Sequence, residues 1–201
     1  MIDVYVARLP QSAGLEPLSC AERQKDIEKI SNERVRREKY YVWKLLEYAV
    51  KKSLGADASR LNFTKGKNQR WGCDACEISL SHSGEAIAVA ISDRSVGVDV
   101  ERIRVKSTER MADYILTERE IGEYAEIAES DNAKWLMIKW CEKEAIFKSQ
   151  NKDSFVPSKI ESSSFFCKLS ELTLGGEPYI LVTAASENDD VRVVEVLDFY
   201  A

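Results

Sequence analysis

The sequence is poor in the side chain that many metalloenzymes depend on, because it has a single histidine, His82, among 201 residues. A site that needs two histidines is therefore impossible, which excludes HExxH zinc peptidases and iron enzymes with two histidine ligands. Long apolar runs and a basic excess are also missing, since the formal net charge is −5. We therefore expect no membrane span and no general affinity for nucleic acids.

Signals for export and for a disulfide framework are missing too. The start, MIDVYVARLP, lacks the basic-then-apolar layout of a signal peptide, so we expect a cytoplasmic protein. The five cysteines are an odd number, and we expect reduced thiols. Cys73 and Cys76 form a C-x-x-C pair, but zinc would need further ligands and a thioredoxin-like site would need a following helix. A plain loop is the expectation there.

What the sequence does contain is a set of alternating and helical segments typical of an α+β protein. Strands are expected at 2–9, 77–81, 86–92, 96–101, 165–169, 179–184 and 191–197, and helices at 31–54, 108–127 and 132–149. Each part of the chain thus combines a helix with antiparallel strands. We predict an N-terminal half at 1–95 and a C-terminal half at 96–201.

One predicted strand, VGVDVE at 96–101, carries two acids. Because side chains alternate across a strand, the valines share one face, and Gly97, Asp99 and Glu101 share the other. Two neighbouring carboxylates provide the oxygen ligands that a hard cation such as Mg²⁺ prefers. The alternative is an ordinary half-exposed strand with solvated acids.

The predicted helix at 132–149 carries a second candidate set. Glu144 and Lys148 are four residues apart and share a helix face. Trp140 lies one turn earlier on that face, and with Phe147 it would partly exclude water. The alternative is a weak surface ion pair.

The segment LSHSG, which contains Ser81 and His82, ends another predicted strand. Small residues allow a ligand to approach the backbone, and a histidine beside a turn can donate to an anion. The alternative is a surface histidine without a role.

In this order, SHSG, VGVDVE and WCEKEAIFK resemble the motifs of the 4′-phosphopantetheinyl transferases. That family has an LSHSG strand end, a GVDxE strand and a WxxKEAxxK helix, and TERE at 117–120 resembles its T-x-x-E segment. The match covers 34–148. The length and the extra helical part before SHSG resemble the long, surfactin-type branch. This implies the fold of that family, with two similar halves in one chain that acts as a monomer.

The resemblance implies a holo-[acyl-carrier-protein] synthase. It would transfer 4′-phosphopantetheine from coenzyme A to a serine of an acidic apo acyl or peptidyl carrier protein, releasing adenosine 3′,5′-bisphosphate. By motif match, Asp99, Glu101 and Glu144 would hold Mg²⁺, with Mn²⁺ as the alternative. Lys148 would neutralise phosphoryl charge and Glu144 would take the serine proton. Whether Glu144 is ligand, base or both stays open, and His82 completes the predicted catalytic set.

The resemblance also implies a coenzyme A site in the first half of the chain. Ser81 and His82 match positions that hold its phosphates, and Lys148 would contact it as well. Gly66 and Lys67 match the family's G-K-P segment beside the nucleotide, although Asn68 replaces the proline.

A basic cluster at the start of the helix at 31–54 suits the 3′-phosphate, since guanidinium groups bind phosphate well. We expect Arg36, Arg37 and Lys39 to act together there, and the alternative is a solvated helix face.

The carrier protein is expected to dock on the insert at 111–127. Ile115, Leu116 and Ile121 are either its apolar anchors or core residues of an amphipathic helix. Two other functions stay open: a binding module for coenzyme A or carrier protein without turnover, and a Mg²⁺-dependent pyrophosphate hydrolase that needs no carrier protein.

Overall fold

The computed structural model describes residues 1–11, 16–66, 69–103, 108–150 and 152–200. In chain order, its helices and strands are β1 (Ile2–Arg8), α1 (Ala21–Glu28), α2 (Glu33–Leu54), β2 (Phe63–Lys65), β3 (Trp71–Cys73), β4 (Glu77–Ser83), β5 (Ala86–Ser92), β6 (Val96–Arg102), α3 (Thr108–Ile115), α4 (Glu118–Tyr124), α5 (Asn132–Gln150), β7 (Phe166–Leu174), β8 (Glu177–Ala185) and β9 (Val191–Val196). Short 3₁₀ turns lie at Ala58–Arg60, Pro157–Lys159 and Ser162–Ser164. Within the described ranges, no helix is long and apolar enough to cross a membrane.

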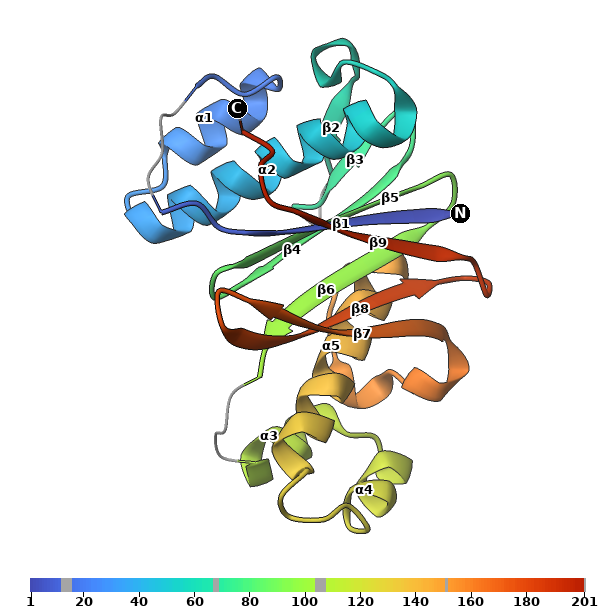
Figure 1. The fold of residues 1–201 in the computed structure, drawn as a ribbon. Helices are drawn as coiled ribbons and strands as arrows, with labels where there is room; N and C mark the ends of the chain where they lie inside the picture. Colours follow the sequence, from blue (N-terminus) through green and yellow to red (C-terminus); the bar gives the residue numbers. More distant parts are fainter. Residues whose placement is uncertain (12–15, 67–68, 104–107, 151, 201) are drawn as a thin grey trace.

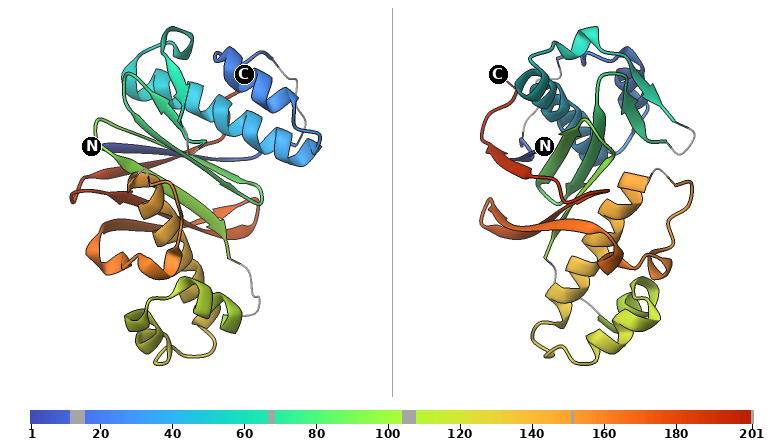
Figure 2. Two further views of the ribbon diagram at one scale, coloured as in Figure 1. Left: turned by 180° about the vertical axis from the view of Figure 1, so that it is seen from behind. Right: turned by 90° about the vertical axis from the view of Figure 1, so that its right-hand side faces the viewer.

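The elements form four layers, with two sheets packed face to face between helices (Figures 1 and 2). One sheet has the strand order β4-β5-β1-β9 and is covered by α2, and the other has the order β6-β8-β7 and is covered by α5. All pairs are antiparallel except β1 with β9. The short helices α3 and α4 pack around the first half of α5, at the lower end in Figure 1.

The strand β5 is buried along its whole length, and its sequence explains why. The alanines at 86, 88 and 90 face the second sheet, whereas Ile87, Val89 and Ile91 pack under α2. Small side chains on one face let the two sheets approach closely, and large ones fill the space below the helix. The valines at 96, 98 and 100 of β6 complete the core between the sheets, as their alternation predicts.

The predicted mixture of helices and antiparallel strands is confirmed, and several predicted elements agree closely. The helix α2 begins after Asn32, whose side chain accepts the Val35 N–H, and it ends at Gly55 with φ 64°. Glycine adopts this left-handed conformation without the steric cost of a side chain. The last strand, β9, belongs to the predicted C-terminal half but pairs with β1 of the predicted N-terminal half. The division into two similar halves stays a prediction.

The prediction of one helix over 108–127 is wrong, because two helices occupy this region. The helix α3 ends at Ile115, and Thr117 caps α4. The Thr117 hydroxyl accepts the Glu120 N–H, and the Glu120 carboxylate accepts the Thr117 N–H. This reciprocal capping box starts a new helix. The sequence pattern TERE therefore has a local structural role, independent of any family motif.

Candidate active site

The site lies where α5 crosses β6, and Gly97 permits this crossing. A Cβ at residue 97 would lie 1.8 Å from the carbonyl oxygen of Ala145 and 2.7 Å from the backbone nitrogen of Ser149. Only a residue without a side chain allows a helix backbone so close to a strand. The approach brings the last turns of α5, with Glu144 and Lys148, over Asp99 and Glu101.

The Lys148 ammonium lies at the centre of this group. Its Nζ donates to Asp99 Oδ1 at 2.6 Å and to the carbonyl oxygen of Val98 at 3.2 Å. The nearest oxygen of Glu144 is 3.9 Å away. The side chains of Lys148 and Glu144 are only 20% and 23% exposed, unlike a solvated pair on a helix surface. The structure thus brings together the four residues that the two motifs contribute.

Glu101 is held from two sides. Its Oε2 accepts the Ser83 hydroxyl at 2.6 Å, and its Oε1 accepts the Trp140 indole N–H at 3.3 Å. Trp140 in turn packs edge-on against Phe155, with ring centroids 5.5 Å apart. Phe147 lies 5.0 Å from the same ring, so Trp140 and Phe147 both belong to an apolar wall beside the carboxylates.

The environment shifts the protonation of three of these groups. Burial raises the pKa of the Glu144 carboxyl; Lys148 opposes this shift, while Asp99 and Glu101 add to it. Burial also raises the pKa of Glu101, and the Asp99 charge adds to the effect. Burial by itself would lower the pKa of Lys148, but Asp99 and Glu144 together raise it above the usual value. The site therefore contains a firmly protonated lysine beside carboxylates that accept protons more readily than usual.

The donor atoms suit a hard cation. Asp99 Oδ2 is buried and has no hydrogen-bond partner among the described residues, although a buried carboxylate oxygen normally has one. Within the same part of the chain, no three acidic, cysteine or histidine side chains form a ready-made metal cluster. The carboxylates of Asp99, Glu101 and Glu144 fit Mg²⁺ or Mn²⁺ in chemistry. The ion would take its other ligands from substrate phosphates and water.

Ser81 and His82 point to opposite faces of β4. The Ser81 hydroxyl donates to Asp99 Oδ1 at 2.7 Å, whereas His82 lies on the side of α2, with Nδ1 3.7 Å from Glu38 Oε2. Burial lowers the pKa of His82, and the cations of Lys148 and Lys39 lower it further, against the effect of Glu38. The structure therefore brings His82 to the basic start of α2 and joins Ser81 to the acidic site.

The basic cluster lies on the first turns of α2. Lys39 lies near His82, and the Arg37 guanidinium donates to the carbonyl oxygen of Gln11 at 3.0 Å. Arg36 is half-buried on the same turns. A further cation, Arg23 of α1, was not foreseen: it donates to the Lys39 carbonyl oxygen at 3.0 Å and stacks over the Trp43 ring at 5.3 Å. Only its place in the fold, away from solvent, distinguishes it from other arginines.

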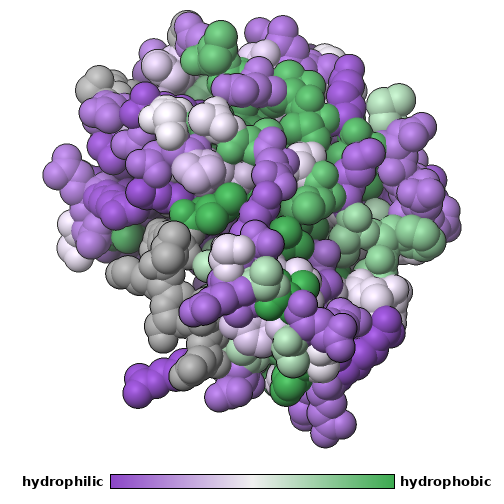
Figure 3. Space-filling model, turned by 60° about the horizontal axis from the view of Figure 1, so that its bottom comes forward, coloured by the Kyte–Doolittle hydropathy of each residue, from purple (hydrophilic) through white to green (hydrophobic). Residues whose placement is uncertain are grey.

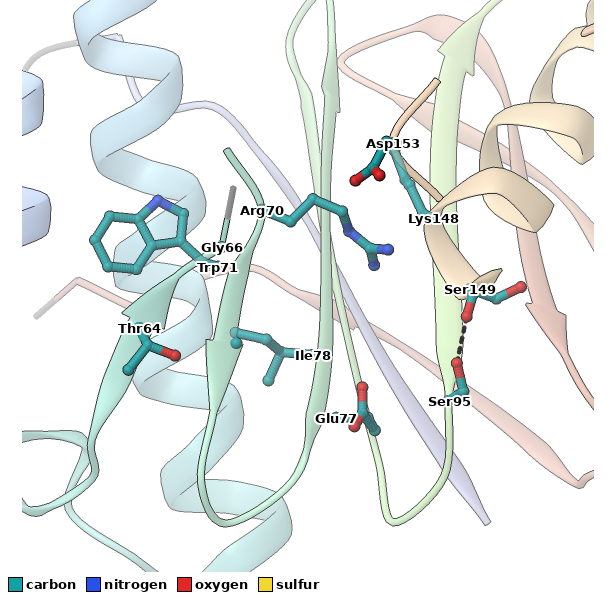
Figure 4. A pocket seen from close by; sticks show the side chains of 11 residues that line it. Thr64, Gly66, Arg70, Trp71, Glu77, Ile78, Ser95, Lys148, Ser149 and Asp153 are labelled. Carbon is teal, nitrogen blue, oxygen red and sulfur yellow. Dashed lines mark hydrogen bonds between the residues drawn. The ribbon is translucent and has the colours of Figure 1, made fainter. Parts of the chain in front are cut away.

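A cavity of about 390 Å³ opens between the β2–β3 hairpin and the end of α5 (Figure 4). Gly66 and Lys148 line it from opposite sides, and the Arg70 side chain extends across it toward Asp153. The Gly66 N–H donates to the Arg70 carbonyl oxygen at 2.7 Å. Lys67 and Asn68 lie outside the described residues. The sequence reasoning missed Arg70, whose basic character within a polar loop was the available signal.

Two predicted details concern the other motifs. All five cysteines are free, and burial together with the neighbouring Cys73 raises the pKa of Cys76 to about 12, so this thiol is protonated at neutral pH. In the insert, Ile115 and Leu116 are buried, which agrees with the alternative that they are core residues of an amphipathic helix. Ile121 and its neighbour Tyr114 are 47% and 58% exposed.

The comparisons with known proteins agree with this location. The family model described as the 4′-phosphopantetheinyl transferase superfamily matches residues 95–177. The matched segment contains Asp99, Glu101, Glu144 and Lys148, and it leaves out α2 and β4. The match covers less than half of the chain, and the superfamily that it indicates is one of transferases that move phosphopantetheine. The comparison with curated proteins found no match.

Proposed function

We propose that this protein transfers the 4′-phosphopantetheine group of coenzyme A to a serine of an apo acyl or peptidyl carrier protein. One observation carries the proposal: a largely buried lysine lies among three carboxylates where α5 crosses β6, it also lines the cavity of about 390 Å³, and all four residues belong to the segment that matches the superfamily model. A protein that only binds coenzyme A would not need buried acids with raised pKa values beside a protonated lysine.

In the proposed reaction, the carrier serine oxygen attacks the phosphorus that bears the pantetheine arm. A new phosphorus–oxygen bond forms to the serine, and the bond to the bridging pyrophosphate oxygen breaks, releasing adenosine 3′,5′-bisphosphate. Glu144 takes the serine proton, because its raised pKa makes it a stronger base than an exposed glutamate. Lys148 neutralises the charge on the transferring group, and its raised pKa keeps it cationic.

Asp99, Glu101 and Glu144 would hold Mg²⁺, or Mn²⁺ in its place. When bound, the ion neutralises pyrophosphate charge and so lowers the barrier to displacement. Asp99 Oδ2 supports this assignment, because it is buried and has no hydrogen-bond partner among the described residues. A bound cation would compensate its charge.

The nucleotide of coenzyme A would bind between the cavity and the start of α2. His82, Lys39 and the half-buried Arg36 offer cationic or hydrogen-bonding groups on that side of β4. Arg70 lines the cavity together with Lys148, so it adds a phosphate contact to the set that the sequence suggested.

The carrier protein would dock at the end of the molecule formed by α3 and α4. Tyr114 and Ile121 are exposed there, and Figure 3, with this end brought forward, shows apolar side chains interrupting a hydrophilic surface. Tyr114 also lies 6.3 Å from the Trp140 ring, next to Glu101, so a partner bound there would be close to the reacting atoms. We further propose a cytoplasmic monomer.

Intact-mass spectrometry tests the proposed activity. An apo carrier protein incubated with this protein, coenzyme A and Mg²⁺ should gain one phosphopantetheine group, and EDTA should abolish the gain. Glu144→Gln should reduce the rate about 10²- to 10⁴-fold, the usual contribution of a general base, with the fold intact. Coenzyme A without carrier protein serves as the control for a hydrolase. Release of phosphopantetheine in that control, without transfer to any carrier, would contradict the proposal.

A further inference from the structure

Three serines at alternate positions of β4 face the neighbouring strand β6. Each Oγ accepts one backbone N–H of β6: Ser79 from Val98 at 2.9 Å, Ser81 from Val100 at 3.2 Å and Ser83 from Arg102 at 3.3 Å. The two strands belong to different sheets, and each is the edge strand of its own sheet. The serine hydroxyls therefore replace the backbone ladder that would otherwise join two adjacent strands.

This arrangement solves a problem of buried backbone groups. The residues of β6 alternate between pairing with β8 and facing away from it, and Val98 and Val100 are fully buried. An N–H group that is buried at such a position without a partner is strongly destabilising. The spacing of two residues in SLSHS matches the spacing of the outward N–H groups of β6. The serines thus have a structural role that is common to all three.

Two of the three serines have an additional contact. The Ser81 hydroxyl donates to Asp99 Oδ1 at 2.7 Å, and the Ser83 hydroxyl donates to Glu101 Oε2 at 2.6 Å. The position that corresponds to Ser79 in this register is Gly97, which has no carboxylate. The molecule therefore contains the same serine contact to β6 both with and without an attached acid.

The hydrogen-bonding capacity of Ser81 is fully used within the protein. A serine hydroxyl has one proton to donate and two lone pairs to accept with. The proton goes to Asp99, and the lone pairs accept the Val100 N–H at 3.2 Å and the Lys148 ammonium at 3.3 Å. No donor remains for a phosphate oxygen. This favours a positioning role for Ser81 over the coenzyme A contact that the family resemblance implies.

We propose that Ser81 and Ser83 are positioning residues that fix the orientation of the two carboxylates beside the cation site. Ser81 holds Asp99 Oδ1 and leaves Oδ2 for the cation, whereas Ser83 holds Glu101 Oε2 while Trp140 holds Oε1. Asp99 supports this most directly, because its Oδ1 is held by Ser81 and Lys148 while its Oδ2 has no partner among the described residues. Fixed ligand orientation raises metal affinity, since less order is lost on binding. The identity of the reaction that this orientation serves rests on the proposed function.

Alanine substitutions at the three serines separate the two roles. Ser79→Ala is the matched control, because it removes an inter-sheet hydrogen bond but touches no site carboxylate. Mn²⁺ affinity of each variant is measured from the electron paramagnetic resonance signal of free Mn²⁺, with no substrate present. Coenzyme A affinity is measured by calorimetry in EDTA, and thermal unfolding reports on the shared structural contact.

Ser81→Ala and Ser83→Ala should weaken Mn²⁺ binding about 10- to 100-fold, the effect typical of residues that orient metal ligands. Ser79→Ala should leave Mn²⁺ affinity unchanged, although all three variants lower the melting temperature. Ser81→Ala should also leave coenzyme A affinity in EDTA unchanged, and in transfer assays it should lower kcat rather than raise the KM for coenzyme A. Ser83→Thr, which keeps the hydroxyl, should retain Mn²⁺ affinity.

Equal losses of Mn²⁺ affinity in Ser79→Ala and Ser81→Ala would overturn the proposal, as would a parent protein that binds no Mn²⁺. Weaker coenzyme A binding by Ser81→Ala in EDTA would restore Ser81 to the substrate site and overturn its positioning role. If Ser81→Ala does not fold, Ser83→Ala tests the same device at the neighbouring carboxylate. If the parent transfers no phosphopantetheine but Mn²⁺ affinities follow the expected order, the proposed function fails and the positioning role stands.

Discussion

The two long helices cover their sheets in different ways. α2 packs on its sheet through large apolar side chains, among them Trp43, Leu45 and Leu46, and its basic residues lie mainly at its ends. α5 approaches β6 at Gly97 with its backbone, and it carries charged side chains into the contact. The comparison shows that a helix packed by side chains serves as scaffold, whereas close backbone approach over a glycine brings charged groups within hydrogen-bonding distance of a strand.

The different packing imposes different requirements on charge. α2 buries one charged side chain, Glu38, which pairs with Arg34 and lies near His82, whereas α5 buries the ammonium group of Lys143 completely. This group donates to Glu120 Oε2 at 2.5 Å and to the carbonyl oxygens of Ile115 and Pro157 at 2.8 and 3.1 Å. Three acceptors satisfy its three protons. The pair of Lys143 and Glu120 thus ties α4 to α5 without taking part in the proposed chemistry.

Removing this buried charge should have the largest effect. Lys143→Met should lower the free energy of unfolding by about 3–5 kcal/mol, because Glu120 is left buried and charged without its partner. Lys134→Met is the matched control on the same helix: its ion pair with Glu171 is exposed and should contribute at most about 1 kcal/mol. Urea unfolding measures both. Equal losses in the two variants would mean that the buried pair has no special role in holding α4 on α5.

Separating α5 from β6 should have a smaller effect on stability. Gly97→Ala should cost about 1–3 kcal/mol, since the new methyl group forces the helix backbone away, and it should also weaken Mn²⁺ binding. Gly122→Ala is the control, because a Cβ there meets nothing within 4 Å. In a helix interior this exchange should stabilise by up to about 1 kcal/mol. A neutral Gly97→Ala variant would show that the close approach is not required.

Neutralising Glu144, the proposed base, should have the smallest effect on stability. It should stabilise the fold although it lowers the activity. The pKa of Glu144 is raised in the folded protein, which means that the fold favours the protonated carboxyl. This stabilisation is fully present below the unfolded pKa and is lost as pH rises through the folded pKa. In EDTA at neutral pH, Glu144→Gln should therefore raise the free energy of unfolding by roughly 0.5–2 kcal/mol, the size of a typical single stabilising substitution.

The comparison of Glu144→Gln with the parent should depend on pH. The difference in the free energy of unfolding should vanish in acid, where the Glu144 carboxyl of the parent is protonated and therefore uncharged like glutamine. Unfolding curves at acid and neutral pH measure this difference. A gain that is the same in acid and at neutral pH would point to packing rather than charge. A loss at neutral pH would mean that the Lys148 contact dominates at Glu144.

The regular elements, and the residues that meet where α5 crosses β6, were largely predictable. Period-two alternation located β5 and β6, and the helical period with Gly55 located α2, because these patterns express burial of one face. The motifs also named Asp99, Glu101, Glu144 and Lys148, which the structure brings together. The separation of α3 from α4 at Thr117 was missed because the apolar pattern continues across this residue. The capping box that starts α4 there is a purely local signal.

By itself, the sequence determined which residues are available, which strand faces they occupy, and that one histidine limits the chemistry. Only the tertiary structure decided their partners. It placed β9 beside β1, set Gly97 under the α5 backbone, buried Lys143 against Glu120, and gave the hydroxyl of Ser81 to Asp99. The physical reason is that periodicity encodes burial along one element, whereas hydrogen bonds between residues far apart in sequence depend on how elements meet in space.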